Sequence, residues 1–111
     1  MLDFQLYRRP ARRRIAHFAN LARMGWTDDD IRAALRNSTT MQTSAEILCS
    51  VDMGEKGQKR VERKADAAES RLAAIAAKYG AKVEWSGDPR GCPSLEWERT
   101  AEGYSRSYGI D

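Results

Sequence analysis

Apolar residues in the second half of the chain recur every three or four positions, which is the period of an amphipathic helix. Over residues 58–79 they are Val61, Ala65, Ala68, Leu72, Ile75, Ala76 and Tyr79. Most positions between them are charged, and Gly80 follows as a typical helix stop. The pattern predicts a long helix whose alanine-rich face can pack closely against a sheet or another helix.

After this helix the pattern changes to an alternation of apolar and polar residues, which predicts strands with one apolar face each. The apolar positions are Val83, Trp85, Leu95 and Trp97. Between the two strands, residues 88–91 read Asp-Pro-Arg-Gly and meet the preferences of a type I turn. A two-stranded hairpin is marginally stable alone, so we expect it to pack on the alanine-rich helix.

Shorter helices are predicted before residue 53. The first covers residues 10–24. Thr27 can cap the second, residues 28–36, and three aspartates in its first turn suit the helix dipole. This second helix is expected to close at Asn37-Ser38. A helix, a glycine-containing turn and a capped helix also begin a helix-turn-helix, but any helical hairpin uses the same signals.

A third short helix is predicted over residues 41–51, after a cap at Thr39-Thr40. Two glycines within residues 53–57 then indicate a boundary. It separates residues 1–53, a helical half with a basic arm, from residues 54–111, the long helix and hairpin. We expect the two halves to form one compact domain.

The predicted fold class is therefore α+β, with three short N-terminal helices followed by a long helix that packs on a C-terminal β-hairpin. The tail beyond residue 100 contains Tyr104, Tyr108 and Ile110 among small residues. It either adds a third strand to the hairpin or ends the chain without joining the sheet.

Positive charge is concentrated near the N-terminus. The chain of 111 residues has a net charge of +3, yet residues 1–23 contain six arginines and a single acid, Asp3. The candidate nucleic-acid-binding residues are Arg8, Arg9, Arg12, Arg13 and Arg14. Such a cluster indicates an anionic partner, or it is simply the solvated face of a helix.

Residues 82–92, which read Lys-Val-Glu-Trp-Ser-Gly-Asp-Pro-Arg-Gly-Cys after a helix ending in Tyr79-Gly80, resemble small uncharacterised proteins of bacteriophages and prophages. Other matching segments are Gly25-Trp26-Thr27-Asp28, Thr40-Met41, Glu46-Ile47-Leu48-Cys49, Tyr104 and Tyr108-Gly109-Ile110. Pro93-Ser94 departs from the group, which continues there with strand-forming residues. Because proline removes a ladder donor, the second strand should start late or lie at an edge. The resemblance implies a phage context and no particular activity.

The sequence contains no recognisable catalytic set. His17 is the only histidine and has no acidic partner close in sequence, and the spacing of Cys49 and Cys92 fits no zinc motif. We therefore expect a protein without enzymatic activity, cofactor or metal. No apolar run is long enough to span a membrane, and we expect a location in the cytoplasm of a bacterial host.

These features favour a protein-binding function, in which a small phage product inhibits or redirects a host or phage protein, as anti-CRISPR and similar host-takeover proteins do. The candidate partner-binding residues are Lys82, Glu84, Asp88 and Arg90, on the hairpin and its tip. The alternative is nucleic-acid binding or transcriptional regulation through the N-terminal basic helix. Open strand edges would also allow a homodimer.

Overall fold

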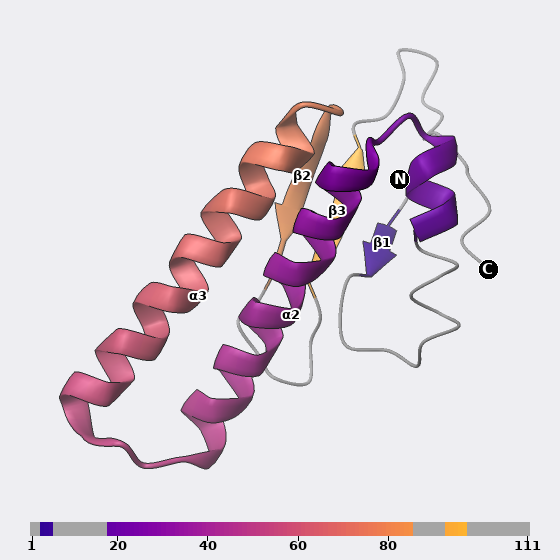
Figure 1. The fold of residues 1–111 in the computed structure, drawn as a ribbon. Helices are drawn as coiled ribbons and strands as arrows, with labels where there is room; N and C mark the ends of the chain where they lie inside the picture. Colours follow the sequence, from indigo (N-terminus) through magenta and orange to yellow (C-terminus); the bar gives the residue numbers. More distant parts are fainter. Residues whose placement is uncertain (1–2, 6–17, 86–92, 98–111) are drawn as a thin grey trace.

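The computed structural model describes residues 3–5, 18–85 and 93–97 (Figure 1). Its elements are β1 Asp3–Gln5, a helical stretch over residues 18–23, α2 Asp28–Ser50, α3 Gly54–Ala77, β2 Ala81–Glu84 and β3 Ser94–Trp97. The two long helices run side by side and cover one face of a small sheet (Figure 1). The α+β class is confirmed, but the predicted number of separate N-terminal helices is wrong.

Helix α2 begins where the sequence predicted. The Thr27 side chain accepts a hydrogen bond from the Asp30 backbone N–H at 3.2 Å, and three aspartates occupy the first turn. The helix then continues to Ser50 without a break at Asn37-Ser38. The second and third predicted helices are therefore one helix, and the predicted cap at Thr39-Thr40 does not exist.

Polar side chains in the middle of α2 bond within the helix instead of ending it. Asn37 Nδ2 donates to the carbonyl oxygen of Ala33 at 2.8 Å, and the hydroxyls of Thr39 and Thr40 donate to carbonyl oxygens one turn earlier. Such bonds are compatible with a continuous helix. Apolar residues before and after this point, including Ile31 and Met41, are fully buried. Tertiary packing of one continuous stripe therefore overrides the local end signals.

Helix α3 confirms the long helix, with its start four residues earlier than predicted. Ala68, Leu72 and Ala76 are fully buried on its apolar face. Gly54, its first residue, and Gly80, which follows it, have positive φ angles of 71° and 74°, a conformation that glycine adopts without steric cost. The turn between α2 and α3 is thus only residues 51–53.

The sheet has the strand order β1-β3-β2, and both pairings are antiparallel. The predicted hairpin is confirmed: Val83 lies opposite Leu95, and Ala81 opposite Trp97. Leu95 and Trp97 are buried against the helices. The strand β3 starts directly after Pro93, as expected, but it lies in the centre of the sheet.

The third strand of the described sheet is β1, which comes from the N-terminus and pairs with β3. The tail that was a candidate for this role lies outside the described residues. The buried core contains Leu21 and Trp26 together with residues of α2, α3, β2 and β3. The helix pair and the sheet therefore share one set of buried contacts.

Candidate binding groove between α2 and α3

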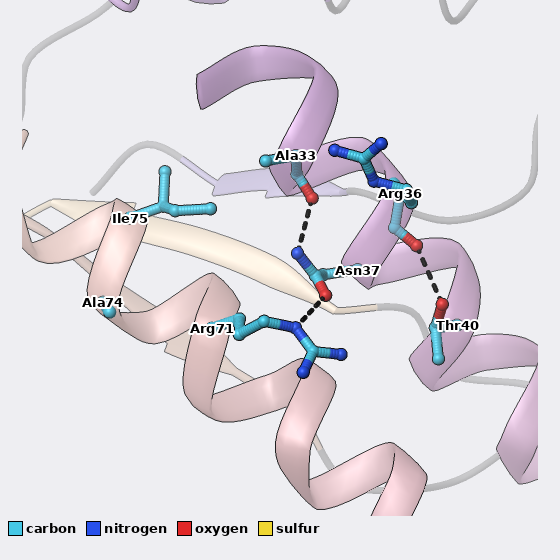
Figure 2. A pocket seen from close by; sticks show the side chains of 7 residues that line it. All are labelled: Ala33, Arg36, Asn37, Thr40, Arg71, Ala74 and Ile75. Atoms are coloured by element: carbon cyan, nitrogen blue, oxygen red, sulfur yellow. Dashed lines mark hydrogen bonds between the residues drawn. The ribbon is translucent and has the colours of Figure 1, made fainter. Parts of the chain in front are cut away.

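A groove of about 470 Å³ lies between the two long helices (Figure 2). It is lined by Ala33, Arg36, Asn37 and Thr40 of α2 and by Arg71, Ala74 and Ile75 of α3. The sheet lies behind the helix pair in both views, so the groove opens on the side of the helices away from the sheet (Figures 1 and 2). Its walls belong to two rigid, mutually packed helices.

Arg71 is held in place by a short chain of hydrogen bonds (Figure 2). Its Nε donates to Asn37 Oδ1 at 2.9 Å, and Asn37 Nδ2 donates to the carbonyl oxygen of Ala33 at 2.8 Å. Asn37 is buried, with 7% of its surface exposed, whereas Arg71 is exposed. Because only Nε is used, the two Nη groups of Arg71 remain for another acceptor.

Arg36 provides a second guanidinium from the α2 side of the groove. Its side chain is exposed, and its carbonyl oxygen accepts a hydrogen bond from the Thr40 hydroxyl at 3.1 Å. The ion pairs found within residues 3–5, 18–85 and 93–97 are Lys59–Glu55 and Lys78–Asp30, and neither involves a groove arginine. Arg36 and Arg71 thus both line the groove, and neither has a carboxylate partner in the part of the chain that the structure describes. Their guanidiniums point in opposite directions, with Asn37 between them (Figure 2).

Charge is segregated around α3. Basic residues at positions 60, 64, 71 and 78 are spaced by four and seven residues, so they share one face of the helix. Arg71 and Lys78 both contact α2, which places this face along the groove. The acidic residues at positions 55, 62, 66 and 69 share a different face by the same rule. Positive charge therefore continues along this face of α3 before and after Arg71, which lines the groove.

Acidic residues lie on α2 beyond the lining of the groove, toward the start of the helix. Asp29 lies one turn before Ala33 and two turns before Arg36, on the same face of α2. It is exposed, as is Asp28, while Asp30 is bound by Lys78 Nζ at 3.3 Å. Arginines therefore line the groove, and exposed aspartates lie on α2 beyond one end of this lining.

The predicted partner-binding residues are only partly described. Lys82 and Glu84 lie on β2, exposed, with Lys82 opposite Glu96 in the neighbouring strand. They alternate with Ala81 and Val83, which pack toward the helices, so they lie on the far face of the sheet from the groove. Asp88 and Arg90 lie outside the described residues, and so do Arg8, Arg9, Arg12, Arg13 and Arg14.

Sequence reasoning missed the groove residues because α2 was divided in two. With a break at Asn37-Ser38, Arg36 and Thr40 belong to different helices and share no face. In one continuous helix, positions 33, 36, 37 and 40 line one side. Arg71 is one of the charged residues between the apolar positions of residues 58–79, and only its bond to Asn37 shows that its face of α3 borders α2.

Other chemistry is sparse in the described segments. Cys49 is an exposed free thiol near the end of α2; His17 and Cys92 lie outside the described residues. Within those residues no group of three or more His, Cys, Asp or Glu side chains could hold a metal ion. No helix among them is long and apolar enough to cross a membrane.

Comparisons of the chain with protein families, with curated proteins and with solved structures found no match. The resemblance to phage proteins therefore stays a prediction. The groove and its two arginines are therefore the features that bear on the function of the protein.

Proposed function

We propose that this protein is a non-enzymatic binding protein that associates stoichiometrically with a partner protein through the α2–α3 groove. The observation that supports the proposal is the pair formed by Arg36 and Arg71, two exposed guanidiniums on rigid helices without an ion-pair partner among the described residues. Arginine is one of the residues most often found to dominate binding energy at protein interfaces.

The anchoring of Arg71 suits this role. A free arginine side chain loses conformational entropy when a partner fixes it, and that loss reduces affinity. The bond from Nε to Asn37 Oδ1 already restricts Arg71 and leaves its outer nitrogens available. Because Arg71 is already restricted in the folded protein, less conformational entropy is lost when a partner binds it.

In the phage setting that the resemblance implies, the partner is a host or phage protein in the bacterial cytoplasm, which this protein inhibits or redirects. The hairpin face with Lys82 and Glu84, together with the tip at Asp88 and Arg90, stays a second predicted surface. Lys82 and Glu84 lie on the face of the sheet away from the groove, so this surface and the groove can be tested separately.

The proposal is tested by affinity capture of the tagged protein from host cells, with and without nuclease treatment. We compare the wild type with the double variant Arg36→Glu/Arg71→Glu. The matched control is Arg63→Glu, which makes the same kind of charge change at an exposed α3 position outside the groove lining. Circular dichroism and thermal melting show whether each variant is folded.

We expect a nuclease-resistant protein partner near a 1:1 ratio, which is lost with the double variant and kept with Arg63→Glu. Retention of the partner by the folded double variant would show that the groove is not the binding surface. Loss of all captured material after nuclease treatment would instead support the alternative, nucleic-acid binding through the N-terminal arginines.

A further inference from the structure

We infer that the α2–α3 groove recognises a mixed-charge segment of the partner protein: an acidic side chain bound by the guanidinium of Arg71, and a basic side chain that reaches Asp29 on α2. This inference rests on the proposed function, because it specifies the chemistry of the ligand at the same groove.

The acidic side chain fits the middle of the groove. The guanidinium of arginine presents its N–H donors in a planar fork that matches the two oxygens of a carboxylate. Arg71 is already oriented by Asn37. Ala33, Ala74 and the half-buried Ile75 provide an apolar lining in the same groove. That lining suits the methylene groups of an aspartate or glutamate side chain.

The basic side chain fits the aspartates beyond one end of the groove lining. Asp29 lies eight residues before Asn37, the residue that Arg71 contacts, which corresponds to a rise of about 12 Å along α2. An extended peptide covers a similar length, about 10 Å, in three residues. A segment whose acidic and basic residues are three positions apart can therefore reach both charges.

The same arrangement disfavours a nucleic-acid strand along the full groove. Phosphates repeat at short intervals along a nucleic-acid backbone, so a strand that contacts Arg71 and runs toward the start of α2 would bring further phosphates to the aspartates. Asp28 and Asp29 are exposed there and would repel them. A protein segment of mixed charge matches both Arg71 and the aspartates, and a polyanion matches only Arg71.

The inference is tested by nuclear magnetic resonance titration of the ¹⁵N-labelled full chain. The probes are the capped peptide Ac-Glu-Ala-Ala-Lys-NH₂, its reverse Ac-Lys-Ala-Ala-Glu-NH₂, and versions with glutamine in place of glutamate or of lysine. A single-stranded octathymidylate is the polyanion probe. The readouts are the backbone amides of α2 and α3 and the side-chain Nε–H signals of Arg36 and Arg71.

We expect one of the two mixed-charge peptides to shift the signals of Ala33, Arg36 and Arg71. Replacement of its glutamate by glutamine should weaken binding by about tenfold or more, as for loss of a charge-assisted hydrogen bond. Replacement of its lysine should weaken binding to a smaller extent, since Asp29 is exposed and its interactions are screened.

Two variants connect these shifts to the groove. Asn37→Asp places an internal carboxylate beside Arg71, so it should compete with the peptide and weaken its binding by about tenfold. Arg71→Gln, a second variant with no added charge, should do the same. Ser70→Ala, next to Arg71 but outside the lining, should leave the titration unchanged.

Absence of shifts with every peptide overturns the inference, as does equal binding of the glutamate and glutamine forms. Groove shifts with octathymidylate alone would also overturn it and assign the groove to a polyanion. The proposed function fails separately: if capture of the partner depends on Arg36 and Arg71 while the peptides fail, the groove remains the binding surface and only this charge pattern is wrong.

Discussion

The ring of Tyr79 stacks on the indole of Trp26, with centroids 4.4 Å apart and planes inclined by 12°. The Tyr79 hydroxyl donates to Asp30 Oδ2 at 2.5 Å and accepts from the Thr27 backbone N–H at 3.2 Å. The Tyr79 carbonyl accepts from Trp97 Nε1 at 3.1 Å. This tyrosine therefore joins the start of α2, the end of α3 and the sheet, and it fixes how the two walls of the groove lie at one end.

Removal of the stacked indole should strongly destabilise the fold. Trp26 is 4% exposed and belongs to the core, so Trp26→Ala should lower the free energy of unfolding by about 3–5 kcal/mol. Tyr79→Phe keeps the ring and loses only its hydroxyl bonds, so it should cost less. Denaturant titration measures both. A cost of Trp26→Ala below about 0.5 kcal/mol, as at ordinary surface sites, would be incompatible with this packing.

The bond from Tyr79 also predicts a pH dependence of stability. The pKa of Asp30 is lowered from its ordinary value of 3.8, mainly by the hydrogen bond from Tyr79. Burial opposes this shift as the second largest effect, and Lys78 lowers the pKa further by a smaller amount. A carboxylate whose folded pKa is depressed stabilises the protein above its unfolded pKa, and this contribution is lost as pH falls through the folded pKa.

The stability difference between wild type and Tyr79→Phe should therefore be full at neutral pH and shrink below pH 3.8. Unfolding is followed by circular dichroism at a series of pH values, with Asp30→Asn as the control in which this titration is absent. If the difference in the free energy of unfolding between wild type and Tyr79→Phe stays constant down to the lowest pH, the role assigned to the Asp30 carboxylate is contradicted.

Leu72 tests the packing of the long helix on the sheet and on α2. It is fully buried in the middle of the alanine stripe, so Leu72→Ala should cost about 2–5 kcal/mol. Ser70→Ala, at an exposed position two residues away, should stay within about 0.5 kcal/mol of the wild type. Equal effects of the two substitutions in denaturant titrations would mean that the stripe is not core.

The continuity of α2 can be tested at residues 38 and 39. Ser38 is buried and its hydroxyl has no hydrogen-bond partner among the residues that the structure describes, so Ser38→Ala should increase stability by up to about 1 kcal/mol. Thr39→Ala should be nearly neutral, because the Thr39 hydroxyl only bonds back to Leu35. If Thr39 instead capped a separate helix, its loss would cost about 0.5–2 kcal/mol, which thermal unfolding would detect.

The elements that the sequence predicted well are those whose local signals agree with their burial. The cap at Thr27, the stop at Gly80 and the apolar alternation of the hairpin each found their expected structure. The α2 break was wrong because polar residues at 37–40 resemble a helix end locally. The buried apolar residues before and after positions 37–40 keep α2 continuous. Their burial depends on contacts with α3 and the sheet, which the local sequence does not show.

The groove could not be predicted for the same reason. Its two arginines are 35 positions apart in the sequence, and each by itself is an ordinary residue of a charged helix face. Only the pairing of α2 with α3, through Asn37 and Arg71, brings them to one groove. The strand β1 was missed because three residues are too few to show alternation.

The most direct test of the groove as the partner surface is the affinity of the purified partner for three forms of the protein. These are the wild type, Arg36→Glu/Arg71→Glu in the groove, and Arg90→Glu at the predicted hairpin tip, compared by isothermal titration calorimetry. We expect the groove variant to lose binding by at least about a hundredfold, since two interface arginines commonly contribute more than 1 kcal/mol each and charge reversal adds repulsion. Arg90→Glu should bind like the wild type. The opposite result, with full binding by the groove variant and loss with Arg90→Glu, would assign the partner surface to the hairpin tip and contradict this account.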